Sequence, residues 1–328
     1  MRELDEVAER EGFSGIVRID RGGAAELEQA YGLADRAHGI PNTAGTQFAT
    51  ASATKGLTAL TVIRLIEDGA LDLATTARSV LGSDLPLIGD DVTVEHLLGH
   101  RSGIGDYLDE SAGHEVTEYL MPVPVQELAE TEQFLAVLDG HPTVSAPGER
   151  FAYNNGGYVV LALIAERVSG TGFHELVLRS VCEPAGMGDT AFLRSDELPG
   201  QAALGYIAAD GLQTNVLHLP VRGNGDGGIY TTAADVSALW QAFFGGRIVS
   251  PDWVAEMVRP RSEDPGERRR YGLGFWLHET TGVVMLEGYD AGVSFWSAHD
   301  PAAGTTRTVI SNWTDGAWPV AELLATHT

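Results

Sequence analysis

Ser52 and Lys55 are a pair of residues whose types and spacing are suited to covalent catalysis. A serine hydroxyl becomes an effective nucleophile only when a base takes its proton. Residues three apart on a helix face nearly the same way, so the hydroxyl and the amine would be neighbours. Burial and the positive end of a helix dipole both disfavour a charged ammonium, which lets a lysine accept that proton. The spacing therefore predicts Ser52 as the nucleophile and Lys55 as its base.

Lys55 is also the single lysine among the 21 basic residues of the chain, the other 20 being arginines. Arginine does not lose its proton in proteins, so it cannot replace lysine in this role. A bare Ser-x-x-Lys spacing is frequent by chance, and the alternative is a surface lysine on an ordinary helix. The coincidence of the spacing with the only lysine favours the catalytic interpretation.

Tyr153 and Asn155 follow about 100 residues later, in the segment PGERFAYNN that spans residues 147–155. A phenol beside an amine can relay a proton to a leaving group, and an amide can orient the lysine and a substrate carbonyl. The alternatives are a core aromatic for Tyr153 and the N-cap of the following helix for Asn155. Both alternatives are compatible with catalytic roles.

The elements that must position these residues follow from apolar periodicity. Residues 52–68 have a broad apolar face and end at Gly69, which predicts a helix. Two strand-like runs within residues 13–31 flank Arg21-Gly22-Gly23, which indicates a hairpin. Further helices are expected at residues 93–100, 125–138, 157–168, 173–182, 233–244, 251–258 and 319–326, and strands at 271–278, 282–287, 293–299 and 305–312.

Strands at both ends of the chain with helices between them predict an α+β fold. We expect one antiparallel sheet built from both termini and flanked by helices, with an inserted helical lobe. The expected boundaries are residues 1–71 and 227–328 for the sheet lobe and 72–226 for the helical lobe, with the active site between them. Residues 104–126 form a long, acidic and poorly periodic segment, which we place at the rim of the pocket.

The amino-acid composition limits the kinds of partner that the protein is expected to bind. The 328 residues carry 46 acidic side chains and a formal charge of −25, which weighs against nucleic acid and anionic membranes. Cys182 is the only cysteine, so an intrachain disulfide is impossible. The first twelve residues lack the apolar core of a secretory signal, and the longest strongly apolar run, residues 158–165, is too short to span a membrane. A cytoplasmic location is expected.

With these motifs in view, the sequence resembles the β-lactamase and penicillin-binding-protein superfamily of serine hydrolases, especially class C β-lactamase-like esterases and D-amino-peptidases. Ser52-x-x-Lys55 and Tyr153-x-Asn155 match its first two motifs. The further segments HLLGHRSG, PAGMG, GGIYTT and YGLG, which begin at residues 96, 184, 227 and 271, resemble its landmarks in the expected order. The resemblance covers residues 13–312 and implies the fold predicted above.

The third motif of that family is Lys-Thr-Gly or His-x-Gly on a sheet strand, and the segment GYDAG at residues 288–292 is taken as its counterpart. Tyr289 then replaces the usual cation, and Tyr289 and Asp290 would orient the substrate. The resemblance implies an oxyanion hole made by the main-chain N–H groups of Ser52 and Gly292. A phenol holds a substrate carboxylate poorly, which weighs against penicillin or peptidoglycan unless Arg101 or Arg222 restores a cation.

The resulting prediction is a serine hydrolase that forms an acyl-enzyme on Ser52 and cleaves a small ester or amide without a cofactor. The alternatives are a D-amino-acid peptidase, a β-lactamase, an acyl-transferring synthase, or a catalytically quiet binding relative. The expected substrate is a small ester, amide or peptide, and the oligomeric state stays open. His96 and His100 have a spacing that can bind a metal, and His114 is the one candidate for a third ligand, but structural roles are favoured.

Overall fold

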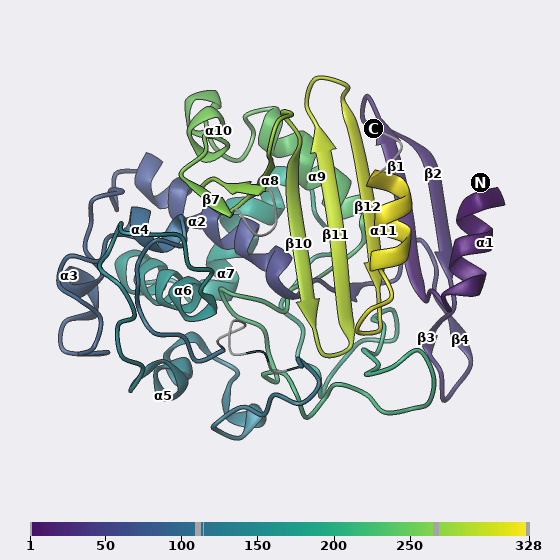
Figure 1. Cartoon of the computed structure of the whole chain (residues 1–328), viewed down its shortest axis with the longest axis horizontal. Helices are drawn as coiled ribbons and strands as arrows, with labels where there is room; N and C mark the ends of the chain where they lie inside the picture. The colour runs from purple at the N-terminus through teal and green to yellow at the C-terminus, as the bar shows by residue number, and fades with distance from the viewer. Residues whose placement is uncertain (1, 109–112, 114, 265–268, 326–328) are drawn as a thin grey trace.

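An antiparallel sheet of eight strands joins the two ends of the chain in the computed structural model, which describes residues 2–108, 113, 115–264 and 269–325 (Figure 1). The order across the described sheet is β2-β1-β12-β11-β10-β9-β8-β7. Its strands are β1 (Gly15–Arg21), β2 (Ala24–Tyr31), β7 (Ser262–Asp264), β8 (Arg269–Tyr271), β9 (Trp276–His278), β10 (Val284–Asp290), β11 (Val293–Asp300) and β12 (Thr305–Ser311). The hairpin β1–β2 and the sheet built from both termini are confirmed.

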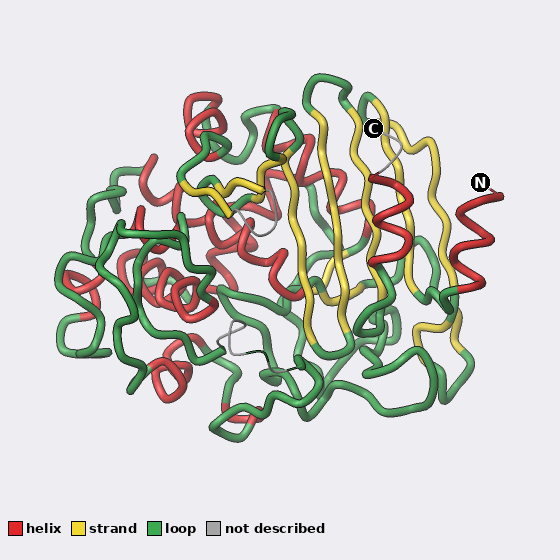
Figure 2. The backbone as a smooth tube through the Cα atoms, in the orientation of Figure 1, coloured by secondary structure: helices red, strands yellow, loops and turns green. Residues whose placement is uncertain are grey.

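Helices cover both faces of the sheet (Figure 2). On one face lie α1 (Arg2–Arg10) and α11 (Trp318–Ala325); on the other are α2 (Thr54–Glu67), α6 (Asn155–Ser169) and α9 (Ala233–Phe244). Alternate residues of a strand point to opposite faces. Accordingly Val17 and Val309 pack with the α1 and α11 side, while Ile16 and Ile310 join the larger core around α2, α6 and α9.

The remaining elements are short. The helices are α3 (Ala77–Leu81), α4 (Val94–Leu98), α5 (Leu135–Leu138), α7 (Phe173–Val177), α8 (Glu183–Ala185) and α10 (Pro251–Met257), with 3-10 turns η1 (Ala51–Ala53), η3 (Val125–Glu127) and η4 (Thr131–Phe134) and a π-helical turn η5 (Leu178–Cys182). Two small ladders pair β3 (Leu33–Asp35) with β4 (Ile40–Pro41) and β5 (Phe48–Ala49) with β6 (Tyr230–Thr231). The α+β class is confirmed.

The prediction of one helix over residues 125–138 is wrong. The segment is divided into η3, η4 and α5, and Leu128 interrupts it with a ψ of 74°. The Gln133 side chain accepts hydrogen bonds from the N–H groups of Ala129 and Glu130 at 2.9 Å. Those bonds start a new turn at Thr131 and prevent a continuous helix.

The single strand expected at residues 271–278 is two strands. β8 and β9 pair antiparallel around a turn that contains Gly274, whose φ is +91°. A Cβ at Gly274 would lie 2.2 Å from Cβ of Ala59, so this glycine lets α2 approach the turn closely.

Two further expectations concern larger units. The division into a sheet lobe and a helical lobe at residues 71 and 227 stays a prediction. In the described part of the chain, no helix has the length and hydropathy needed to cross a membrane.

Candidate active site

Ser52 lies in the turn η1, directly before helix α2, and Ala51 precedes it in a left-handed conformation with φ of +46°. The carbonyl oxygen of Ala51 accepts hydrogen bonds from Thr54 Oγ1 at 2.8 Å and from the N–H of Gly228 at 3.3 Å. A non-glycine residue in this conformation costs on the order of 1–3 kcal/mol and persists only where the surroundings hold it. The nucleophile candidate is thus presented by a strained, well-anchored turn.

Lys55 is only 2% exposed, and its ammonium group contacts three oxygen atoms. Nζ donates to Ser52 Oγ at 2.9 Å, to Asn155 Oδ1 at 2.8 Å and to the main-chain oxygen of Asp226 at 2.7 Å. The structure therefore brings Ser52, Lys55 and Asn155 together in one network. The alternative of a surface lysine does not apply.

Asn154 and Asn155 divide two tasks at the start of α6. Asn154 is the N-cap, and its Oδ1 accepts from the N–H of Gly157 at 2.6 Å. Asn155 is the first helical residue, and its Nδ2 donates to the main-chain oxygen of Leu108 at 3.0 Å. The N-cap alternative for Asn155 is wrong, because its neighbour fills that position and leaves the Asn155 amide to Lys55.

The ring of Tyr153 packs against His100 and Trp276, with centroid distances of 4.3 Å and 5.9 Å, and Lys55 Nζ lies 5.0 Å from its centre. His100 is fully buried, and its Nδ1 accepts from the N–H of Asn154 at 3.1 Å. Burial, and secondarily the charge of Lys55, lowers the pKa of His100, so this imidazole is neutral. His100 thus supports both Tyr153 and the start of α6.

Two carboxylates also border the network, that of Asp106, which is half-buried, and that of Asp226, which is buried. Asp106 accepts from the N–H groups of Asn155 at 2.6 Å and Gly156 at 2.8 Å, and Asp226 accepts from the hydroxyl of Tyr107. Burial raises the pKa of Asp106 to about 6, although these N–H donors oppose the rise. Burial also raises the pKa of Asp226, against the opposing charge of Lys55.

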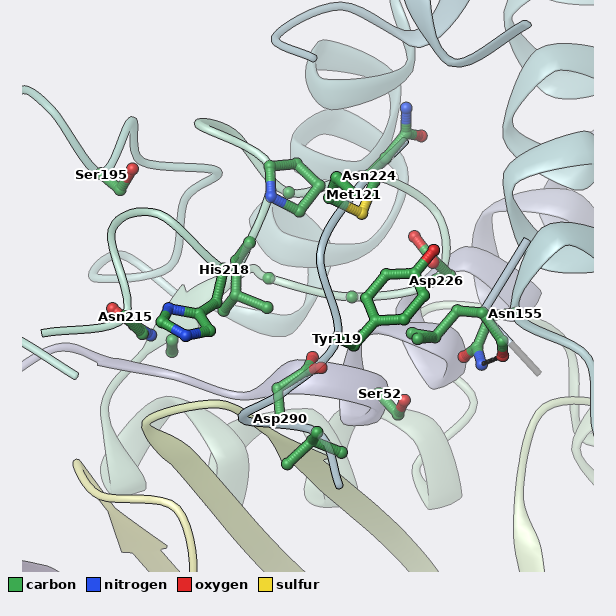
Figure 3. Close-up of a pocket in the computed structure, with 18 of the residues that line it drawn as sticks. Ser52, Tyr119, Met121, Asn155, Ser195, Asn215, His218, Asn224, Asp226 and Asp290 are labelled. Atoms are coloured by element: carbon green, nitrogen blue, oxygen red, sulfur yellow. Dashed lines mark hydrogen bonds between the residues drawn. The ribbon is translucent and has the colours of Figure 1, made fainter. Parts of the chain in front are cut away.

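Two hollows meet at Ser52. The larger is a cavity of about 480 Å³, and Figure 3 shows Ser52 and Asp290 on its sheet side, with Asn155, Asp226, Asn215 and His218 around it. Its apolar lining comprises Ala49, Leu108, Val116, Met121, Leu193, Leu219, Pro220 and Val221. The smaller hollow, about 230 Å³, is lined by Ser52, Tyr153, Asp264, Arg269, Trp276, Glu287, Gly288, Tyr289 and Trp318. A substrate bound at Ser52 can therefore extend in two directions.

Gly292, expected in the oxyanion hole, lies in the turn between β10 and β11. Its N–H donates to Thr314 Oγ1 at 3.0 Å in a buried bond, so that donor is already engaged. The expectation for Gly292 is corrected on this ground.

Tyr289 turns its side chain away from the nucleophile. Its hydroxyl donates to Asp315 Oδ1 at 2.9 Å, and its ring meets Trp318 of α11. Asp290 instead faces the cavity, as the labelled side chain in Figure 3 shows. The two neighbours alternate across the strand, so their side chains leave β10 on opposite faces, although both residues border the larger cavity.

Gly288 is the residue of β10 that lies against the nucleophile turn. A Cβ placed there would be 2.0 Å from the oxygen of Thr50 and 3.1 Å from the nitrogen of Ser52. A strand can approach Ser52 this closely only with glycine at that position. The third motif therefore centres on Gly288, the first residue of the segment GYDAG.

Several contributors lay outside the sequence predictions, namely Tyr107, Asp106 and Asp226. Asp106 and Tyr107 belong to the long segment 104–126, which was predicted at the pocket rim. Tyr107, Tyr119 and Met121 of this segment do line the cavity. Asp226 directly precedes the segment GGIYTT, with no pattern of its own to mark it.

The two arginines considered as substrate-binding cations, and the two histidines considered as metal ligands, make other contacts. Arg101 donates to main-chain oxygens of Gly148 and Arg261, and Arg222 to Glu130 and the oxygen of Phe192, so neither lines the described cavity. His96 forms a capping box with Thr93 at the start of α4. His96 and His100 thus have separate structural surroundings, and His114 lies outside the described residues.

Comparison with known proteins identifies the class that this fold and site define. The sequence model of the β-lactamase family matches residues 2–326, and the chain belongs to that family. The crystal structure of a penicillin-binding protein from Bacillus halodurans is similar over 99% of this chain and 100% of that one, with 33% identity and a TM-score of 0.92. The predicted superfamily is confirmed.

Relatives with named activities are more distant. Esterase EstB of Burkholderia gladioli is 29% identical over 297 residues, which cover 81% of this chain and 75% of the esterase. The D-aminopeptidase of Brucella anthropi is 26% identical over 296 residues, 87% of this chain and 52% of that protein. The family thus includes hydrolases of esters and of D-amino-acid compounds.

Proposed function

We propose that this protein is a serine hydrolase that acts through an acyl-enzyme on Ser52 and cleaves a small ester or amide. The observation that carries the proposal is the contact of 2.9 Å between Lys55 Nζ and Ser52 Oγ within a buried network. In its neutral form Lys55 takes the hydroxyl proton as Oγ attacks the substrate carbonyl carbon. Family membership and the esterase and aminopeptidase relatives support the same reaction class.

In this proposal the oxyanion hole consists of the main-chain N–H groups of Ser52 and Tyr289. Asp290 and Val293 flank a two-residue turn and pair directly across β10 and β11. Residues that flank such a turn exchange hydrogen bonds, and the direction of main-chain groups alternates along a strand. The main-chain groups of Tyr289 therefore face the other edge of β10, beside Ser52. This donor replaces Gly292.

As the tetrahedral intermediate collapses, Tyr153 donates its phenolic proton to the leaving group and takes the proton that Lys55 removed from Ser52. Because Tyr153 lines the smaller hollow together with Ser52 and Trp276, we assign that hollow to the leaving group. The larger cavity then holds the acyl group. Water releases the acyl group from Ser52 and restores the hydroxyl.

A fluorophosphonate probe tests the nucleophile, since it labels an activated serine covalently. We expect the native protein to be labelled and Ser52→Ala to lose the label. Lys55→Arg should lower labelling and ester turnover by roughly 10²–10⁴-fold, the range of a general base. Ser195→Ala is the matched control, because Ser195 lines the same cavity and should leave labelling intact. Unchanged labelling of Ser52→Ala would contradict the proposal.

A further inference from the structure

We propose that the smaller hollow beside Ser52 binds an aromatic ring of the leaving group, so that the substrate is an ester or amide of an aryl or arylmethyl alcohol or amine. This inference rests on the proposed function, which assigns that hollow to the leaving group. It names the chemical class of the group that departs when Ser52 is acylated.

Aromatic side chains from four separate parts of the chain line this hollow. They are Tyr153 just before α6, Trp276 at the start of β9, Tyr289 on β10 and Trp318 at the start of α11. The first, second and fourth are half-buried and Tyr289 is 37% exposed, so each ring keeps surface that a ligand can contact. Aromatic rings pack favourably on one another in offset-stacked or edge-to-face arrangements. The lining is therefore suited to a ligand that is itself aromatic.

Contacts within the protein hold these rings in place. The rings of Tyr153 and Trp276 are nearly parallel, with an angle of 9° between their planes and 5.9 Å between their centroids. The guanidinium carbon of Arg269 lies 4.6 Å from the centre of the Trp276 ring. Tyr289 and Trp318 meet edge to face, with centroids 5.8 Å apart. Side chains that are already ordered lose little conformational entropy when a ligand binds, so the hollow is preorganised.

The hollow begins at the nucleophile and has room for one ring. Ser52 and Gly288 both line it, and a Cβ added at Gly288 would lie 3.1 Å from the nitrogen of Ser52. A ring joined to the leaving oxygen or nitrogen directly, or through one carbon, would therefore lie within it. The volume of the hollow is about 230 Å³, and an apolar cavity of about 150 Å³ is enough for benzene.

The charged residues of the hollow favour a neutral leaving group. Asp264 and Glu287 contribute two carboxylates, and Arg269 contributes one guanidinium. Arg269 forms an ion pair with Glu287 and also covers the Trp276 ring. A leaving group with its own carboxylate, such as the terminal residue of a peptide, would meet more negative than positive charge, which is unfavourable. A neutral ring meets no such penalty.

The test compares benzyl acetate with cyclohexylmethyl acetate, which share the acyl group and differ in whether the ring of the leaving group is aromatic. Each kcat/KM is divided by the rate constant for hydroxide hydrolysis of the same ester, which removes differences in intrinsic reactivity. The benzyl value over the cyclohexylmethyl value is the aromatic preference. Burial alone favours the saturated ring slightly, because its apolar surface is larger. We expect an aromatic preference of about threefold or more, since ring contacts change a rate by roughly twofold to tenfold.

Trp276→Leu and Trp318→Leu should each lower the aromatic preference by roughly twofold or more, and Trp276→Phe should retain most of it. Both tryptophans also pack against the core on the α1 and α11 side. The preference is a ratio of two substrates, so a loss of folded protein does not change it. Trp253→Leu is the control, since Trp253 of α10 lines neither hollow, and it should leave the preference unchanged.

A native preference of one or less would overturn the inference, and so would an unchanged preference in both leucine variants. Binding of the leaving groups to Ser52→Ala separates this inference from the proposed function. Saturation-transfer NMR titrations should show benzyl alcohol bound about threefold or more tightly than cyclohexylmethanol, whether or not Ser52 is the nucleophile. Fluorophosphonate labelling that persists in Ser52→Ala, with this binding preference intact, would refute the nucleophile alone. Equal binding of the two alcohols, with labelling that depends on Ser52, would refute the aromatic subsite alone.

Discussion

Lys55 meets partners from three parts of the chain: Ser52 on its own helix turn, Asn155 at the start of α6, and the main-chain oxygen of Asp226. The three oxygens lie 2.7–2.9 Å from Nζ in different directions, and the amine is therefore fixed in direction as well as in place. An arginine would present a planar, permanently charged group to a site built around a single nitrogen. The adjacent residues Asn154 and Asn155 allow the role of one such contact in activity to be separated from a role in stability.

Asn155→Ala should mainly lower activity, whereas Asn154→Ala should mainly lower stability. Asn155→Ala removes the amide that orients Lys55, and we expect ester turnover to fall by roughly tenfold or more with little change in stability. Asn154→Ala removes the N-cap of α6 and should lower the free energy of unfolding by about 0.5–2 kcal/mol. Urea unfolding and steady-state kinetics on both variants check this pair. Equal effects of both variants on turnover and stability would contradict the division of tasks.

At the scale of elements, helix α6 and strand β10 both bring their ends to Ser52. The first turn of α6 directs its free N–H groups toward Asp106, which compensates them with a carboxylate. The edge of β10 approaches through Gly288, where a side chain would collide with Thr50. Each element thus places a terminal or edge main-chain group near the nucleophile.

The carboxylate of Asp106 should make the stability of the protein depend on pH between about 4 and 6. Burial raises its pKa in the folded state to about 6, above the ordinary value of 3.8 for an aspartate, so the folded state binds more protons in this interval. Stability must then fall as pH rises from 4 to 6 and level off above 6, by roughly 1–3 kcal/mol from this group.

Asp106→Asn lacks this titration and isolates it from other groups. We expect the unfolding free energy of the native protein minus that of the variant to decrease from pH 4 to pH 6. Urea unfolding at pH 4, 5, 6 and 7 measures the difference. A difference that is constant or increases with pH would contradict the assignment.

At the scale of the whole molecule, the larger core encloses the only cysteine. Cys182 is 2% exposed within the cluster that packs around α2, α6 and α9, and burial raises the pKa of its thiol to about 12. A protonated, buried thiol reacts slowly with alkylating reagents.

Iodoacetamide should therefore leave the native protein unmodified at pH 8 and label one site after unfolding in urea. Mass spectrometry of both samples checks this expectation. Because Cys182 lies in the core around α2, its rate of labelling reports opening of the same packing that supports Lys55. Rapid labelling without denaturant would show that this core opens more readily than its packing implies.

Local patterns predicted much of the architecture. The β1–β2 hairpin, the α2 helix and three strands near the C-terminus follow from periodicity and turn residues over short spans. The helix expected at residues 125–138 failed because the Gln133 side chain starts a new turn, a competition that apolar spacing does not reveal. The strand expected at residues 271–278 is divided in two because the chain turns at Gly274, which packs closely against α2.

Spacing along one turn suffices to pair Ser52 with Lys55, because the turn η1 that holds Ser52 continues directly into α2. The acceptors that hold Lys55 come from positions 155 and 226, and only folding brings them within 3 Å of its amine. The position of the third motif likewise depended on the register of β10 and β11, which determines whether residue 288 or residue 292 lies beside the nucleophile. A change of one residue in strand register reverses which side chains face the site, so the motif letters alone could not decide it.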